Sequence, residues 1–225
     1  MQKKTILIIS LIISIFSLFY FIVDYYGYIR YLKLHYYDNN SYLQNYTLLP
    51  KSNKDRVVIC FTTTLDNIFN IKPFINSILD QSLRVDEIIL ILPYDDVKNV
   101  PDNIKKILSV QGYKKKYNSS PNVICSVLTE PEATTKIILV EPSTIYPSDF
   151  VENIVEASNK HPDKIIYSSN TKQTKYGILI KPKFFDDKIS KYEETCSNTD
   201  FLDKCTNNPT IIYNCGNILP IWKFN

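Results

Sequence analysis

Short apolar runs recur along this chain of 225 residues. They lie within predicted strands at residues 57–61, 86–93, 123–128 and 137–140. An uninterrupted apolar run of this length is typical of a strand buried on both faces. Between the first two runs, apolar residues repeat at helical spacing and predict a helix over about 70–82. Buried strands that alternate with helices predict a doubly wound α/β domain, in which helices cover both faces of a mostly parallel sheet.

Weaker patterns complete this expectation. A helix is predicted over about 100–110, beginning at Pro101, and a second one follows Ser148, a candidate N-cap, as far as about Lys160. The remaining predicted elements are strands at 165–167, 176–180 and 210–213 and a helix near 199–206.

The first segment of the chain predicts a membrane anchor. Residues 5–23 carry no charge over 19 positions, close to the roughly 20 residues that span a bilayer as a helix. No small-residue cleavage site follows, which favours an uncleaved signal-anchor over a signal peptide. We therefore divide the chain into a cytosolic tip and transmembrane helix (1–23), a juxtamembrane stem (24–54) and an α/β domain (55–225).

Charge and cysteine patterns bear on the compartment. Lys3 and Lys4 favour a cytosolic N-terminal end, so a type II protein is expected, with its C-terminal domain in the ER/Golgi lumen or outside the cell. Arg30 and Lys33 near the other end of the span leave the orientation open. Asn-x-Ser/Thr acceptors stand at Asn39, Asn45 and Asn118.

None of the five cysteines has Cys-x-x-Cys spacing, so no zinc site is indicated. A formal net charge of +3 is small and argues against a nucleic-acid-binding protein, which would need a concentrated basic face.

Two polar stretches follow predicted strands. Thr62, Thr63 and Thr64 come after the first strand, and the stretch that begins at Glu141 comes after the fourth. In open α/β sheets, ligands bind beyond the carboxyl ends of the strands. These two stretches are therefore the candidate site, provided that the fold brings them together. The alternative for Thr62–Thr64 is a strand-to-helix loop with a hydroxyl cap, and the alternative for Glu141 is a strand end exposed to solvent.

The ordered motifs of residues 57–206 resemble those of GT-A-type glycosyltransferases. In that family a strand runs into Thr-Thr, a helix ends in Ser-Leu-x-x-Gln-Thr, and a later strand runs into Asp-Asp-Asp-x-x-Tyr-Pro before a helix and a His-Pro turn. The matching residues here are Thr62-Thr63, Ser77-Ile78, Gln81-Ser82, Tyr146-Pro147 and His161-Pro162.

The resemblance implies a nucleotide-sugar donor whose diphosphate is held by Mn²⁺ or Mg²⁺. The three family aspartates fall on Glu141, Pro142 and Ser143, so only the first position keeps a carboxylate and the implied metal site is weakened. By the same resemblance, Thr62 and Thr63 face the nucleotide, and Glu141 and Ser143 face the diphosphate, with Glu141 as the metal ligand. Asp200 is the loosely aligned candidate for the base that activates the acceptor hydroxyl.

Two functions remain open. The first is a membrane-anchored glycosyltransferase that moves a sugar from a nucleotide-sugar to a glycan or protein acceptor. The second is a domain of the same origin that no longer catalyses and serves as a tethered binding or accessory subunit, paired with an active glycosyltransferase. An unrelated anchored interaction protein would leave the ordered motifs as coincidence.

Overall fold

The computed structural model describes residues 2–25, 27–52, 55–113, 121–168, 177–185, 210–212 and 219–220. The chain forms two compact units, Met1–Asp38 and Asn39–Asn225.

The first unit consists of two helices. Helix α1 spans Gln2–Tyr25, and its segment Lys4–Tyr25 is long and apolar enough to cross a membrane, with a mean hydropathy of 2.9. Gly27 follows in the left-handed conformation (φ 75°), and its N–H donates to the carbonyl of Asp24. Helix α2, Tyr28–Tyr36, begins directly after this glycine. The first part of the expected stem is therefore helical.

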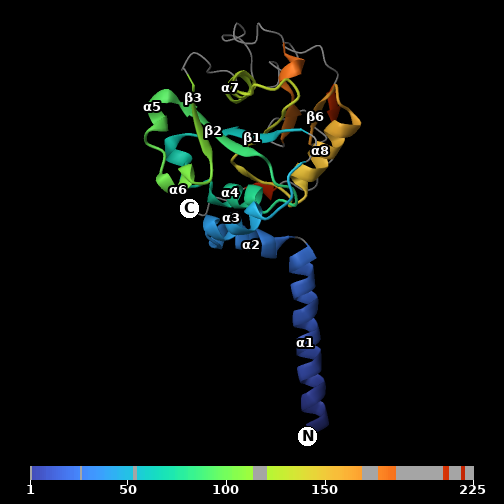
Figure 1. Cartoon of the computed structure of the whole chain (residues 1–225). Helices are drawn as coiled ribbons and strands as arrows, with labels where there is room; N and C mark the ends of the chain where they lie inside the picture. The colour runs from blue at the N-terminus through green and yellow to red at the C-terminus, as the bar shows by residue number, and fades with distance from the viewer. Residues whose placement is uncertain are drawn as a thin grey trace. The chain divides into compact units, whose positions relative to one another are not determined.

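The second unit is built around a seven-stranded mixed sheet in the order β3-β2-β1-β4-β7-β6-β8. Figure 1 labels β1, β2, β3 and β6 of this sheet. Strands β1, β2, β3 and β4 are mutually parallel, as is the pair β6 and β8, whereas β7 runs antiparallel to both of its neighbours. The strands are β1 Val57–Thr62, β2 Glu87–Pro93, β3 Ser109–Tyr113, β4 Lys136–Leu139, β6 Ile165–Tyr167, β7 Ile178–Ile180 and β8 Thr210–Ile212. The expectation of an α/β fold with a mostly parallel sheet is confirmed.

The chain reverses its direction of sheet growth at β1. From β1 it moves outward to β2 and β3, and it then returns to place β4 on the other side of β1. The carboxyl ends of β1 and β4 therefore flank a topological switch point, where the connections leave in opposite directions. Open α/β sheets bind ligands in the crevice at such a point.

Helices α4, Lys72–Leu79, and α8, Phe150–Lys160, supply one face of the core. They bury apolar side chains against alternate residues of the central strands, including Ile59 of β1 and Leu90 of β2. The amphipathic patterns predicted for both helices are confirmed, although α4 is shorter than the predicted 70–82. Two shorter helices, α5 Tyr94–Val97 and α6 Asp102–Lys105, lead to β3.

Helix α7, Pro121–Thr129, covers the other face (Figure 1). Here the expectation of a strand at 123–128 is wrong. A short apolar run fits either a buried strand or a buried helix, and periodicity alone does not separate the two. In α7, Val123, Ser126 and Val127 are buried at helical spacing, and the two valines pack on the β1–β2 side of the sheet. The predicted helix over 100–110 is also wrong in its second half, where β3 begins at Ser109.

The compact unit begins at Asn39, before the boundary at residue 55 expected from the sequence. Helix α3, Asn39–Thr47, packs on α4. The buried Asn39 side chain donates to Oδ1 of Asn76 at 2.9 Å, and the hydroxyl of Tyr46 accepts from the backbone N–H of Val85 at 2.9 Å. Burial raises the pKa of Tyr46 to about 12.

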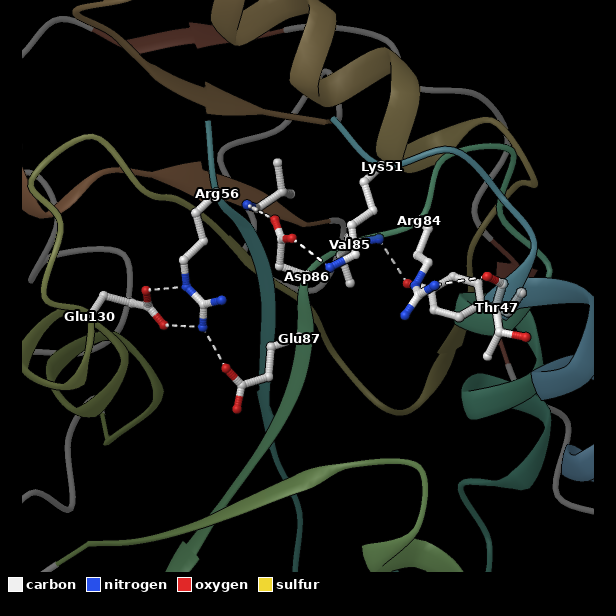
Figure 2. Close-up of polar contacts among 10 residues, drawn as sticks. Thr47, Lys51, Arg56, Arg84, Val85, Asp86, Glu87 and Glu130 are labelled. Carbon is white, nitrogen blue, oxygen red and sulfur yellow. Dashed lines mark hydrogen bonds and ion pairs between the residues drawn. The ribbon is translucent and has the colours of Figure 1, made fainter. Parts of the chain in front are cut away.

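Ion pairs gather at the amino-terminal ends of β1 and β2, away from the polar loops that follow the strands (Figure 2). Arg56 contacts the carboxylates of Glu130 and Glu87 from just before β1. The Glu130 side chain is only 3 % exposed, so it depends on Arg56 for charge compensation. Nearby, Asp86 accepts hydrogen bonds from Lys51 and from the backbone N–H of Val57. These pairs anchor the strand starts.

Candidate functional site

A pocket of about 380 Å³ opens where β1 and β4 end. Its lining residues stand at the last position of β1 and β3 or in the segments that follow β1 and β4: Thr62, Thr63, Thr64, Asn67, Asn70, Ile71, Tyr113, Glu141, Pro142 and Ser143. The two strands pair in parallel up to Cys60 and Leu139, and the N–H of Val140 still donates to the carbonyl of Cys60 at 3.1 Å. Because of this register, the segments that follow β1 and β4 lie side by side at the pocket.

The wall that follows β1 is made of hydroxyl and amide groups. After Thr64 the chain forms a short 3₁₀ turn, Leu65–Asn67 (η1), and then leads into α4. Nδ2 of Asn67 donates to Oγ1 of Thr64 at 3.0 Å, which closes the turn. Hydroxyls and amides both donate and accept hydrogen bonds, so this wall suits the edges of a nucleobase or the hydroxyls of a sugar.

Glu141 supplies the charge on the opposite wall. The hydroxyl of Ser143 lies 3.4 Å from Oε1 of Glu141, a long and weak hydrogen bond. Burial raises the pKa of the Glu141 carboxyl above its ordinary value, and the hydrogen bonds from Ser143 only partly oppose this shift. The site therefore favours the neutral form of Glu141 more than water does.

Tyr146 fixes the backbone of this wall. Its buried hydroxyl accepts a hydrogen bond of 2.9 Å from the N–H of Glu141. The loop between them is closed by Thr144, whose Oγ1 donates to the carbonyl of Glu141 at 2.7 Å. The Tyr146 ring also packs on Phe150 and Phe74, which ties the loop to α8 and α4. Burial raises the pKa of the Tyr146 hydroxyl, which stays protonated.

Gln81, just beyond α4, connects the same loop to α8. Its Nε2 donates to the carbonyls of Ser77 and Pro147, and its Oε1 accepts from the N–H of Val151 in the first turn of α8. The helix start is thus capped by Gln81, and the prediction that Ser148 caps this helix is wrong: the residue at the N-cap is Asp149, and it makes no side-chain cap. The side chain of Ser77 accepts from the N–H of Tyr146 at 3.3 Å.

The lining residues do not reproduce the two-carboxylate metal site of the GT-A motif. Among the described lining residues, Glu141 provides the carboxylate, and Ser143 provides a neutral hydroxyl. Mn²⁺ and Mg²⁺ prefer anionic oxygen ligands, and a neutral hydroxyl is a poor substitute for the second carboxylate. Throughout the described part of the chain, no group of three or more His, Cys, Asp or Glu residues is arranged to hold a metal ion.

The structure brings together four of the five residues singled out from the sequence. Thr62 and Thr63 line the pocket from one side, and Glu141 and Ser143 line it from the other. Asp200 and the predicted helix near 199–206 lie outside the described residues. The contributions of Asn70 and Tyr113 were missed. Recognition of 109–113 as a strand would have marked Tyr113, since it stands at a strand end beside β2.

No protein-family model matches this chain, and no curated protein matches its sequence. Among solved structures, a crystal structure of 4-diphosphocytidyl-2C-methyl-D-erythritol synthase is 10% identical and covers 77% of this chain and 95% of its own, with a TM-score of 0.47. The synthase of the same name from Anaerococcus prevotii DSM 20548 is 12% identical, with 71% and 89% coverage and a TM-score of 0.42.

Proposed function

We propose that this protein is a membrane-anchored, glycosyltransferase-like protein whose pocket binds a nucleotide-sugar. One observation carries the proposal: the loops that begin at Thr62 and Glu141 line a single pocket at the topological switch point of the sheet. Nucleotides bind at this place in doubly wound sheets. The motif residues that resemble the GT-A family support the donor class, and α1 supports the anchor, with residues 5–23 in the membrane.

Each wall has a proposed task. The hydroxyls of Thr62 and Thr63 bind the nucleotide, and Glu141 and Ser143 face the donor's phosphates and sugar. The neutral form of Glu141 is the one that tolerates a phosphate nearby, since two anions at close range repel. The reaction would pass the donor's sugar to a hydroxyl of a glycan or protein acceptor. On the resemblance alone, Asp200 would accept the proton of that hydroxyl.

A non-catalytic function is the second candidate, and a specific observation favours it. The position of the family's second metal-binding aspartate is Ser143, and burial disfavours the charge on Glu141. A pocket of this kind can hold a nucleotide-sugar without promoting departure of the diphosphate. The chain would then act as a tethered binding or accessory subunit paired with an active glycosyltransferase.

Thermal melting of the full chain in detergent, with a panel of nucleotide-sugars and with or without Mn²⁺, tests the proposal. A ligand that binds the folded state raises the melting midpoint by mass action. We expect at least one nucleotide-sugar to raise the midpoint. Glu141→Ala should alter that shift, whereas Glu132→Ala, at an exposed loop position outside the pocket, should leave it unchanged.

The outcomes separate the two candidates. A shift that requires Mn²⁺, together with release of free nucleoside diphosphate, supports the transferase. A shift that is indifferent to Mn²⁺, with no release of the diphosphate when acceptor glycans are added, supports the binding subunit. The absence of a shift with every nucleotide-sugar would contradict both.

A further inference from the structure

We infer that helix α2 lies in the interfacial layer of the membrane that α1 spans, with the side chains of Tyr28, Leu32 and Tyr36 in contact with lipid. This surface, called the α2 stripe below, is an interaction surface for the bilayer itself. The inference rests on the proposed anchoring of the chain by α1.

Chain length places the start of α2 close to the membrane. Three residue steps separate Tyr25, the end of α1, from Tyr28, and even an extended chain covers only about 10 Å over that distance. The headgroup layer beyond the hydrocarbon core is itself roughly 5–8 Å thick. The first turn of α2 therefore cannot lie far outside the headgroups if α1 spans the core.

The break at Gly27 ends the straight course of α1. This residue has a φ of 75°, a left-handed conformation that glycine adopts at low cost. Its N–H donates to the carbonyl of Asp24, and its own carbonyl accepts from the N–H of Tyr31, so the residue ends one helix and starts the next. A continuous helix would carry Tyr28–Tyr36 out of the headgroup layer, whereas the break allows α2 to lie along it.

The α2 stripe gives the helix a lipid-facing side. Tyr28, Leu32 and Tyr36 follow one another at a spacing of four residues, so they share one face of α2. They are 58%, 49% and 78% exposed, whereas Leu34, on the opposite side, is buried. Tyrosine is enriched at membrane–water interfaces because its ring is apolar and its hydroxyl is polar. A stripe of two tyrosines and one leucine therefore matches the interface better than it matches water.

A basic residue completes the pattern. Lys33 is exposed beside the stripe. Interfacial helices combine an apolar face that contains aromatic residues with lysine or arginine, which pair with anionic headgroups. The first unit thus contacts the bilayer through two helices: α1 spans it, and α2 lies on its surface.

Depth-dependent fluorescence quenching tests this arrangement. The full chain is reconstituted in vesicles that contain lipids brominated near the headgroup, and a tryptophan is introduced by Tyr36→Trp. The parent chain, which contains Trp222, is measured in parallel so that only the added emission is compared. Tyr25→Trp, at the end of α1, reports on the span itself. We expect the bromine to reduce the added emission of both variants by about twofold or more.

The three outcomes are distinct. Quenching of both tryptophans supports the inference. Quenching at position 25 without quenching at position 36 overturns the interfacial placement of α2 and leaves the anchor intact. The absence of quenching at both positions overturns the anchor and, with it, this inference, while nucleotide-sugar binding by the pocket would stand.

Discussion

The hydroxyl oxygen of Tyr146 lies 2.9 Å from the backbone nitrogen of Glu141 and accepts its hydrogen bond. Tyr146 is buried and packs against Phe150 of α8, whereas Glu141 provides the carboxylate of the pocket wall. The contact links the packed core to the candidate site, so the position of Glu141 depends on a residue that does not line the pocket.

Removal of this hydroxyl by Tyr146→Phe should destabilise the chain. The ring would still pack, but the N–H of Glu141 would lose its acceptor in a partly buried place, at a cost of about 1–2 kcal/mol in the free energy of unfolding. Chemical denaturation measures the loss. Tyr94→Phe is the matched control, because Tyr94 is 60% exposed. Equal stability of the two variants would show that the Tyr146 hydrogen bond contributes nothing.

Gln81→Leu should cost more than a typical surface substitution. The change preserves the approximate size of the side chain and removes the acceptor for Val151 and the donor to Pro147, so buried backbone groups lose their partners. We expect a loss of roughly 2–3 kcal/mol in unfolding free energy. Gln44→Leu, on an exposed position of α3, provides the comparison. A Gln81 variant as stable as the Gln44 variant would rule out the capping role.

The charge of Glu141 should make the chain less stable as the pH rises. Burial raises the folded-state pKa of this carboxyl above its ordinary value of about 4.5, so the folded chain binds the proton more tightly than the unfolded chain does. Ionisation therefore destabilises the fold between the ordinary and the raised pKa. Glu141→Gln should melt at a higher temperature than the unaltered chain at neutral pH, and the difference should disappear in acid, below the ordinary pKa.

Melting curves across the pH range check this expectation. Glu132→Gln, at an exposed position in the loop before β4, should show no such dependence. A Glu141→Gln midpoint that is lower than that of the unaltered chain at neutral pH would mean that the carboxylate is stabilised in the pocket, contrary to the account given above.

The ion pair between Arg56 and Glu130 should be important for stability. Arg56→Ala leaves Glu130, 3 % exposed, without the guanidinium that faces it, and a buried carboxylate without a partner costs about 3 kcal/mol or more. Lys160→Ala removes an exposed pair with Glu156 and should cost less than about 0.5 kcal/mol. Urea denaturation of both variants gives the comparison. Similar losses would indicate that the Arg56 pair is no stronger than a surface pair.

Glycan mapping tests the orientation of the membrane anchor. If the C-terminal domain is lumenal, we expect a glycan on Asn45, which is exposed on α3. We expect none on Asn39, because its side-chain nitrogen is buried in a hydrogen bond to Asn76. Mass spectrometry of chain from a host that glycosylates proteins shows the occupied sites. A glycan on Asn39 would contradict the contact between α3 and α4.

The sequence predicts the centre of the sheet well because β1, β2 and β4 are buried on both faces and read as continuous apolar runs. The same criterion fails for α7, whose run Val123–Leu128 is also mostly apolar, although Val123, Ser126 and Val127 are buried and Leu128 is exposed. It also fails for β3, because Ser-Val-Gln-Gly-Tyr at 109–113 is an edge strand of intermediate exposure and carries no apolar run. Tyr113 was missed for this reason.

The juxtaposition of the two loops could be predicted because it depends on topology and not on side-chain detail. Parallel strands that end beside each other bring their following residues to one edge of the sheet, whatever those residues are. The cap of α8 could not be predicted in this way. Ser148 is a residue type that is favoured at an N-cap. The N–H of Val151 is instead bound by the side chain of Gln81, which is distant in sequence but lies near because α4 packs beside the loop. Tertiary contacts of this kind leave no local pattern.

Photoaffinity labelling with an azido-substituted nucleotide-sugar, followed by peptide mapping of the full chain, tests the central claim most directly. We expect the label on peptides that contain Thr62–Asn70, Tyr113 or Glu141–Ser143, and we expect excess unmodified nucleotide-sugar to prevent the labelling. Labelling confined to other peptides, or labelling that the unmodified compound does not reduce, would contradict nucleotide-sugar binding at this pocket.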